Sequence, residues 1–453
     1  MPWLPHSDRD RREMLDAMGV SSVEELFADI PAALRETATP ELPPPLTEME
    51  LVAEARRLSA QNRGCDELVC FAGGGIYDRF IPAIVQSVAA RPEFVTPYTP
   101  YQPEASQGTL EAMFEYQSMI CELTAMEIAN ASLYDGATAL GEAVLLAADV
   151  TRRKRALIAD ALSPAARATT RTYCEAMGIE VVELPFDDET GRTDLSALAE
   201  MLDDDVACVA LQQPNYFGVL EEMAEASAAA HDAGALFVAM VEPISLGLIT
   251  PPGEYEADLV VGEGQPLGLP PGYGGPLLGL FACREEYLRR MPGRVVGRSV
   301  DAEGEVAYCL TLQTREQHIR RDRATSNICT NQGLCALAAT AYLAALGPEG
   351  LREVALLSAE RAHQLRDLLV EAGFAPRFSG AFLNEFALKV EGGADAVARA
   401  LADASYLAGP ALGRDFAGLG DCLLLAATER RSAEEAEGFV AALREIDAAG
   451  FGG

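Results

Sequence analysis

The chain has 453 residues, of which 49% are hydrophobic and 23% charged, so it can bury a large core and lacks the composition of a disordered protein. Its 69 acidic residues against 35 basic ones leave a net charge of −34, which excludes the cationic surface that a nucleic acid or an anionic membrane requires. We interpret the acidic excess as an adaptation to high salt, where ions screen the repulsion between like charges.

The pattern of apolar residues and the positions of the cysteines and histidines bear on the location of the protein and on whether it binds a metal. No long apolar run and no apolar segment of signal-peptide type occurs, so we expect a soluble, cytoplasmic protein. The ten cysteines form no CxxC pair and the four histidines lie far from them, so we expect free thiols and no metal site. Only two of the 35 basic residues are lysines, Lys154 and Lys389.

Residues 1–60 are predicted to form a helical arm with proline-rich joints. Thr47 follows the joint Glu41-Leu-Pro-Pro-Pro-Leu46 and is typical of a residue that begins a helix. We expect this arm to lie over a partner or over the main domain.

Residues 61–330 are predicted to form a large α/β domain. Short apolar runs alternate with helical patterns, which favours a mainly parallel sheet covered on both faces. The expected strands are residues 155–159, 179–184, 206–211, 235–241, 257–261 and 281–283. The turn at 71–76 lacks the spacing of a nucleotide-binding loop, so we interpret its glycines as a tight turn that requires positive φ.

Residues 331–453 are predicted to form a small α+β domain. An alanine-rich helix over 333–345 leads into it, followed by a strand at 385–390, a helix at 394–403, a strand at 422–426 and a helix at 432–446.

Four stretches of the large domain are candidates for function. Prolines make residues 96–104 rigid and present Tyr98 and Tyr101, as in a pocket wall or an interface, although a packed surface loop has the same composition. Residues 135–138 begin a helix and could bind an anion, or could form an ordinary turn. Residues 213–218 and 261–268 follow strands at the edge of the sheet where ligands bind, but they offer few ionisable groups.

Together these motifs resemble those of the glycine cleavage system P-protein family, and more narrowly the first subunit of its two-subunit form. The resemblance covers nearly the whole chain and rests on several motifs in the right order. They are Tyr98-Thr-Pro-Tyr-Gln-Pro-Glu104 with Ser106-Gln-Gly108, Tyr134-Asp-Gly-Ala-Thr138, Tyr273-Gly-Gly-Pro276 and Arg323-Ala-Thr-Ser-Asn-Ile-Cys-Thr330.

The resemblance implies the type I fold of enzymes that use pyridoxal phosphate (PLP). In that fold one strand carries an Asp to the pyridine nitrogen and a later turn carries the Schiff-base lysine. The matching turn has Gln265 at the lysine position, and the matching strand, residues 237–241, has Ala239 or Met240 at the Asp position. A glutamine amide cannot form a Schiff base, and a protonated pyridine needs a carboxylate partner. We therefore expect no catalytic residue and no bound cofactor in this chain.

The resemblance also implies partners. A second subunit would hold PLP and decarboxylate glycine, and the aminomethyl group would pass to the lipoyl arm of H-protein, as in glycine dehydrogenase (decarboxylating). Two copies of each subunit would form a heterotetramer. The candidates for the shared interface are two tyrosines and part of a later loop: Tyr98, Tyr101, Thr325, Ser326 and Asn327.

Two alternatives stay open from the sequence. The chain could be a stand-alone PLP-dependent transferase or desulfurase whose lysine lies elsewhere. It could also be a non-enzymatic scaffold derived from the family.

Overall fold

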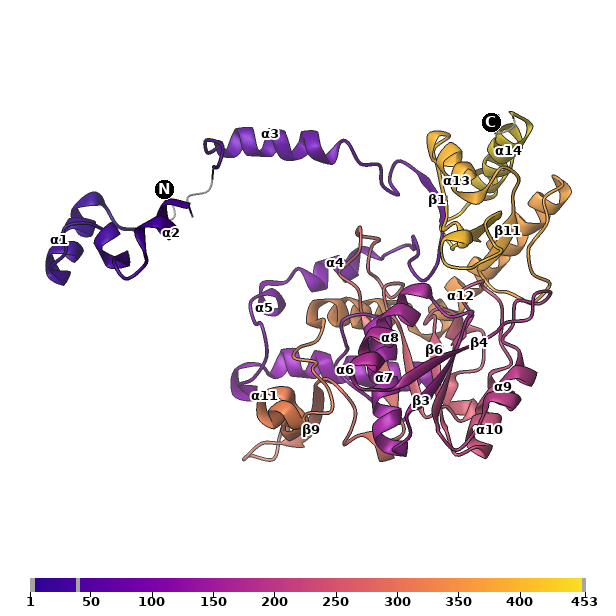
Figure 1. Cartoon of the computed structure of the whole chain (residues 1–453), viewed down its shortest axis with the longest axis horizontal. Coiled ribbons are helices and arrows are strands. Elements are labelled where there is room, and N and C mark those ends of the chain that lie inside the picture. The colour runs from indigo at the N-terminus through magenta and orange to yellow at the C-terminus, as the bar shows by residue number, and fades with distance from the viewer. Residues whose placement is uncertain (1–4, 38–40, 450–453) are drawn as a thin grey trace. The chain divides into compact units, whose positions relative to one another are not determined.

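The structure, a computed structural model, describes residues 5–37 and 41–449 (Figure 1). It separates into two compact units, which divide between Arg63 and Gly64.

The described part of the first unit is helical and buries none of its side chains. The hydroxyl of Thr47 caps α3 by accepting from the backbone of Glu50, as expected from the sequence, and Ser7 caps α1 in the same way. The helices of this unit are α1 (Asp8–Met18), α2 (Ala32–Thr37) and α3 (Glu48–Ser59), with a 3-10 turn, η1, at Glu24–Phe27.

The second unit is built on a seven-stranded sheet in the order β2-β8-β7-β6-β5-β3-β4. The five strands from β3 to β7 run parallel, and β8 is antiparallel to its neighbours β7 and β2. The central strands are continuous Val, Ala and Leu runs because both faces of the sheet are covered. Their bounds are β2 (Ile128–Ala129), β3 (Arg155–Ala159), β4 (Glu180–Leu184), β5 (Val206–Gln213), β6 (Leu236–Val241), β7 (Leu259–Glu263) and β8 (Gly279–Cys283).

Helices pack on both faces of this sheet and connect its parallel strands (Figure 1). The predicted α/β class is thus what the structure has. The helices in this part of the chain are α4 (Ala83–Ala89), α5 (Pro92–Val95), α6 (Gln107–Thr124), α7 (Gly136–Thr151), α8 (Pro164–Ala176), α9 (Leu195–Met201), α10 (Met223–Asp232) and α11 (Gln317–Arg320), of which α7 to α10 lie between the strands in sequence.

A long helix, α12 (Gly333–Glu371), links the sheet to the last part of the chain. It extends well beyond the predicted helix, which ended at residue 345. It is kinked at Gly347, where φ is 62° and Pro348 follows. Its apolar first part has the length and composition of a membrane span, but Cys335, Ala339 and Tyr342 are buried in the main core. It is therefore a core helix.

The C-terminal layer contains two small sheets. A segment from the early part of the chain belongs to this layer. β1 (Val69–Ala72) pairs in parallel with β12 (Tyr406–Gly409), and Phe71 lies in the core of this layer. The predicted division, which placed residues 61–80 wholly in the large domain, missed this. The other elements are β11 (Glu385–Lys389), β13 (Cys422–Ala426), α13 (Ala394–Asp403) and α14 (Ala433–Ala449).

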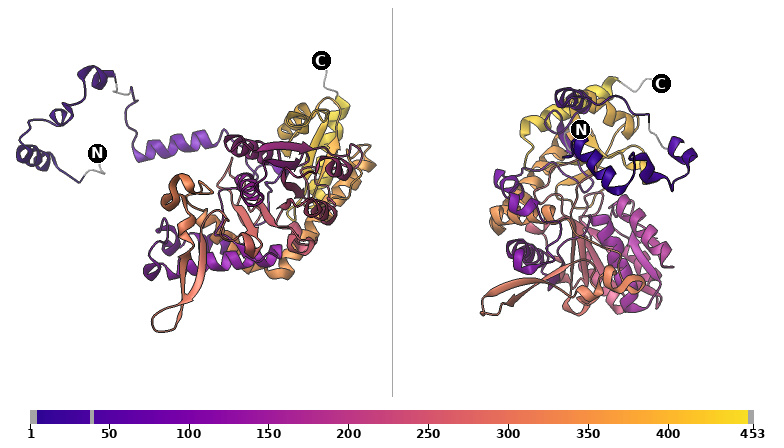
Figure 2. Two further views of the ribbon diagram at one scale, coloured as in Figure 1. Left: turned by 60° about the horizontal axis from the view of Figure 1, so that its bottom comes forward. Right: turned by 90° about the vertical axis from the view of Figure 1, so that its left-hand side faces the viewer.

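A two-stranded hairpin was also missed. Strands β9 (Val295–Val300) and β10 (Val306–Thr311) pair only with each other in the described sheets, and Figure 2 shows them projecting from the second unit. Their outer residues are exposed, so the sequence shows little of the alternation that marks a half-buried strand.

Candidate functional site

The carboxyl ends of β5, β6 and β7 lie side by side, at the edge where open α/β sheets bind ligands. Ala239, expected at the Asp position, lies inside β6 and is fully buried. A carboxylate that the sequence analysis did not single out, Glu242, follows directly after Val241. β6 ends at Val241, where the strand was expected to end, so this carboxylate stands one residue beyond the strand at the edge of the sheet.

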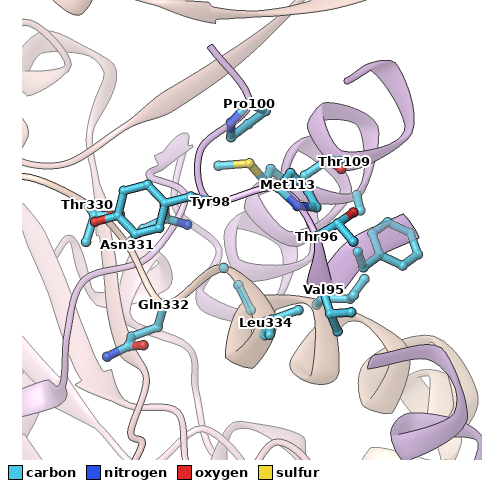
Figure 3. Close-up of a pocket in the computed structure, with 16 residues that line it drawn as sticks. Val95, Thr96, Tyr98, Pro100, Thr109, Met113, Thr330, Asn331, Gln332 and Leu334 are labelled. Carbon is cyan, nitrogen blue, oxygen red and sulfur yellow. The ribbon is translucent and has the colours of Figure 1, made fainter. Parts of the chain in front are cut away.

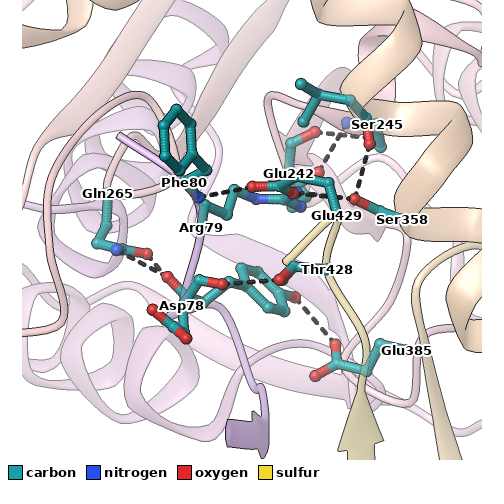
Figure 4. A network of polar contacts seen from close by, with 12 residues as sticks. Asp78, Arg79, Phe80, Glu242, Ser245, Gln265, Ser358, Glu385, Thr428 and Glu429 are labelled. Atoms are coloured by element: carbon teal, nitrogen blue, oxygen red, sulfur yellow. Dashed lines mark hydrogen bonds and ion pairs between the residues drawn. The ribbon is translucent and has the colours of Figure 1, made fainter. Parts of the chain in front are cut away.

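Gln265 is fully buried and its amide is saturated with hydrogen bonds (Figure 4). Its Oε1 accepts from the Tyr77 backbone N–H at 2.9 Å, and its Nε2 donates to the carbonyls of Tyr77 at 3.1 Å and Leu269 at 2.6 Å. The side chain thus pins the segment that leaves β1 to the turn that follows β7.

The N-terminus of α7, where the sequence allowed an anion, is occupied by carboxylates of the chain itself. Glu263 accepts from the backbone N–H groups of Gly136 at 3.0 Å, Leu278 at 3.0 Å and Gln265 at 2.9 Å. Asp135 caps the helix by accepting from Thr138 at 2.7 Å. Burial raises the pKa of Glu263 to about 7, although these hydrogen bonds act in the opposite direction. A side chain at position 136 would collide with the backbone of Glu263, so this close approach requires glycine.

Arg79 joins two further buried carboxylates (Figure 4). Its guanidinium lies 3.5 Å from Glu242 and 3.0 Å from Glu429, and all three side chains are at least nine-tenths buried. Glu242 also accepts from the Ser245 backbone at 2.7 Å. The carboxylate at the end of β6 is therefore already paired.

Glu385, from β11, meets the glycine turn that follows β1. Its carboxylate accepts from the Gly74 N–H at 2.6 Å and from the Tyr77 hydroxyl at 3.0 Å. Gly74 and Gly75 have φ of 83° and 101°, as predicted for this turn, and a Cβ at Gly73 would collide with the Glu385 carboxylate. Burial raises the pKa of Glu385 to about 8.

We call these side chains the sealed cluster: Arg79, Glu242, Glu263, Gln265, Glu385 and Glu429. They bond to one another and to the backbone, they include no primary amine, and a carboxylate holds the helix N-terminus where a phosphate would otherwise bind. Lys154 lies at the opposite, amino end of β3 and donates to the Met177 carbonyl, and Lys389 is an exposed residue of β11. The residues at this edge do not fit PLP.

A second feature lies where the predicted interface residues gather. A hollow of about 490 Å3 opens between α5, α6, the rigid loop after α5 and the start of α12 (Figure 3). Tyr98, Thr330, Asn331 and Gln332 stand along it, while its floor is apolar and includes Met113. Tyr98 is 85% exposed, so its ring has few contacts within this chain.

Arg294 connects the two predicted interface segments, and sequence reasoning missed it. Its buried guanidinium donates to the Tyr101 hydroxyl at 3.3 Å, the Cys329 carbonyl at 2.9 Å and the Thr330 hydroxyl at 2.9 Å. It also lies over the Tyr101 ring, 5.6 Å from the centroid. No motif distinguished this arginine from the other arginines near it in the sequence.

The remaining interface candidates, Thr325, Ser326 and Asn327, lie on the loop that precedes Cys329 and Thr330. Thr325 and Asn327 are exposed, whereas Ser326 bonds to the buried Glu142 of α7, whose pKa burial raises to about 7. The structure therefore brings Tyr101 to the loop end at 329–331 and anchors Ser326 on α7. It shows no contact of Thr325 or Asn327 with either tyrosine among the described residues.

Comparison with known proteins identifies the family of this chain. The model of the glycine cleavage system P-protein family matches residues 1–443. A probable glycine dehydrogenase (decarboxylating) subunit 1 from Moorella thermoacetica is 49% identical over 447 residues, covering 98% of this chain and all of that protein. A similar protein from Thermotoga maritima is 46% identical over 98% of this chain and 99% of its own length.

Solved structures agree with the sequence comparisons. The crystal structure of an inhibitor-bound glycine decarboxylase (P-protein) of the glycine cleavage system has a TM-score of 0.91 at 48% identity, covering 98% of this chain and all of that chain. A sphingosine-1-phosphate lyase from Burkholderia pseudomallei, at 17% identity over 90% of this chain and 92% of its own, shares the fold with a TM-score of 0.66. The expected type I fold of PLP-dependent enzymes is confirmed, and the chain belongs to the glycine cleavage system P-protein family.

Proposed function

We propose that this chain is the subunit of a two-subunit glycine decarboxylase that does not carry PLP. A second subunit of related fold binds PLP and decarboxylates glycine, and the aminomethyl group passes to the lipoyl arm of H-protein. The complex acts in the cytoplasm as a heterotetramer with two copies of each subunit.

The sealed cluster is the observation that carries this proposal. PLP would supply an electron sink for loss of the glycine carboxyl group, but it needs an amine and a phosphate site. Gln265 and Glu263 occupy the corresponding positions and are saturated with bonds to neighbouring backbone. The edge of this sheet therefore stabilises the fold of the subunit, and the contribution to activity is made at a surface.

The rim of the hollow beside Tyr98 is the surface that best supports such a contribution. Proline residues make the loop that carries both tyrosines rigid, and Arg294 holds Tyr101 in place before any partner binds, so little conformational entropy is lost on association. An exposed aromatic side chain on a rigid frame is typical of the residues that dominate binding energy at interfaces. Tyr98 and Tyr101 are placed to complete a cleft that the partner covers, and Thr325, Ser326 and Asn327 would extend the same face.

The helical arm offers a further surface for association, because its described residues bury no side chain among themselves. Its apolar side chains, among them Leu42, Met49, Leu51 and Leu58, are exposed. Such a density of exposed large apolar residues is typical of a surface that associates with another protein.

Reconstitution tests the proposal. The chain, the second subunit with PLP and lipoylated H-protein are mixed, and exchange of the glycine carboxyl group with labelled bicarbonate is measured. We expect exchange only when both subunits are present. Full activity of the second subunit alone would contradict the proposal.

A matched pair of variants locates the contribution. Tyr98→Ala removes an 85% exposed ring and should lower the reconstituted rate by roughly tenfold, a typical loss for a central interface aromatic. Met177→Ala removes a 58% exposed side chain next to α8 and should leave the rate unchanged. Equal rates for the two variants would contradict the role of Tyr98.

Neither alternative function gains support from a specific observation. A stand-alone PLP enzyme would need Lys154 or Lys389 at the carboxyl edge of the sheet, and neither lies there.

A further inference from the structure

A basic hollow lies apart from the sealed cluster, between the segment 286–290 and the segment 312–325. Its volume is about 460 Å3, within the range of sites for small ligands. We call it the arginine pocket, after five of the side chains that line it: Arg289, Arg290, Arg315, Arg320 and Arg323. The other lining residues are Glu286, Leu312, Thr314 and Thr325.

The charge of this pocket is opposite to that of the chain. The chain carries a net charge of −34, yet five guanidinium groups face this hollow together with a single carboxylate, that of Glu286. A chain with 69 acidic residues has ample carboxylates to neutralise its arginines. Five guanidinium groups around one hollow repel one another, so an anion bound among them would be favourable.

The chain itself supplies little of that compensation. Arg290 pairs with Asp149, but within residues 5–37 and 41–449 none of the other four arginines forms an ion pair with a carboxylate. Arg315 donates instead to the carbonyls of Met291 and Gly293, and Arg320 donates to the Thr314 carbonyl at 3.1 Å. These bonds hold the guanidinium groups of Arg315 and Arg320 in place without neutralising their charges.

The cost in stability of gathering these arginine charges is clearest at Arg315. Its Nε is buried and has no hydrogen-bond partner. Burial lowers the pKa of Arg315 below its usual value, while the neighbouring Glu316 acts in the opposite direction. Partial burial of this cation is destabilising, Glu316 offsets part of that cost, and an oxyanion in the pocket would offset more of it.

We propose that the arginine pocket binds a small soluble ligand through a phosphate or carboxylate group. Guanidinium groups pair with such oxyanions through two parallel hydrogen bonds, and the Thr325 hydroxyl adds a further donor at the rim. The concave shape and the half-buried Arg315 favour a small ligand over an acidic protein surface, which an exposed stripe of charges would suit better. Thr325 is also a candidate for the shared interface, but ligand binding is measured on the isolated chain, so its failure and the failure of the proposed function are distinguishable.

Titration calorimetry of the purified full chain tests the proposal, with inorganic phosphate and citrate as probes. Ionic strength is held constant with sodium chloride, because screening alone changes the stability of so acidic a chain. We expect saturable binding of at least one probe. The double variant Arg289→Gln/Arg323→Gln removes two exposed guanidinium groups without disturbing the core, and should weaken binding by roughly tenfold or more.

The control is Arg399→Gln, an exposed arginine on α13 whose loss should leave the affinity unchanged. Circular dichroism of every variant establishes that the fold is retained. Absence of saturable binding for both probes, or equal affinities for parent and double variant, would overturn the proposal. Binding of a polyglutamate peptide without binding of phosphate or citrate would overturn it as well, because it would assign the pocket to an acidic protein.

Discussion

Glu263 and Gln265 stand two positions apart in one turn, and each satisfies the backbone of a neighbouring segment. Both side chains bond within the protein. The proposed correspondence of Gln265 with the Schiff-base lysine could be drawn from the sequence because the turn lies ahead of a recognisable motif. The role of Glu263 could not, because it depends on Gly136 approaching from a helix more than a hundred residues earlier.

The same limit explains the other residues that sequence reasoning missed. Arg79, Glu242 and Glu429 come from three distant parts of the chain, and no local pattern marks them as partners. Arg294 likewise joins segments that are distant in sequence. Local motifs identified the loops that carry the interface candidates, whereas the side chains that hold those loops depend on tertiary packing.

The pH dependence of the folding stability tests whether Glu385 is buried in the sealed cluster in its protonated form. Burial raises the pKa of Glu385 from 4.5 to about 8, so between these values the folded chain holds a proton that the unfolded chain has released. Its contribution to stability is therefore complete at low pH and falls as pH rises towards 8, by at most about 1.4 kcal/mol per pH unit. Glu385→Gln stays neutral, so its stability should decline less over this range.

Urea unfolding at a series of pH values between 5 and 8 measures this difference. Glu391→Gln, which changes an exposed glutamate of the same layer, is the control and should follow the parent. Subtracting the parent curve removes the general effect of the acidic surface. Parallel curves for the parent and Glu385→Gln would show that Glu385 is not buried in the protonated form.

At the scale of elements, the parallel sheet was predictable because its strands are short, apolar and buried on both faces. The predicted runs at 155–159, 206–211 and 422–426 correspond to β3, β5 and β13. Strands β1 and β12 were missed because they pair with each other across more than three hundred residues and present mixed burial. The second half of α12 was missed because Gly347 and Pro348 are typical of a helix end.

The arm gives a prediction at this scale. Leu51 and Leu58 are seven residues apart on α3, so they lie on one face, and both are exposed. Leu51→Lys/Leu58→Lys should leave the thermal unfolding of the isolated chain unchanged, since neither side chain is buried. It should weaken association with the second subunit by roughly tenfold or more, measured by analytical ultracentrifugation.

The control for the arm adds the same charge at polar positions. Ser59→Lys/Gln61→Lys changes two exposed residues at the end of α3 and should associate like the parent. An unchanged affinity for the double leucine variant would show that this face of the arm does not contact the partner.

At the scale of the whole molecule, the net charge of −34 sets the response to salt. Repulsion among surface carboxylates destabilises the compact state, and salt screens it. We expect the midpoint of thermal unfolding to rise steadily between low and molar potassium chloride, together with assembly of the complex. Full stability and assembly in low-salt buffer would contradict the interpretation of the composition as an adaptation to high salt.

The division of labour between two subunits is the central claim, and covalent mapping of the cofactor tests it most directly. The active complex is reduced with borohydride, which fixes PLP to its lysine, and the two chains are separated, digested and analysed by mass spectrometry. We predict a pyridoxyl group on the second subunit alone. A pyridoxyl group on Lys154 or Lys389 of this chain, in proportion to activity, would contradict it.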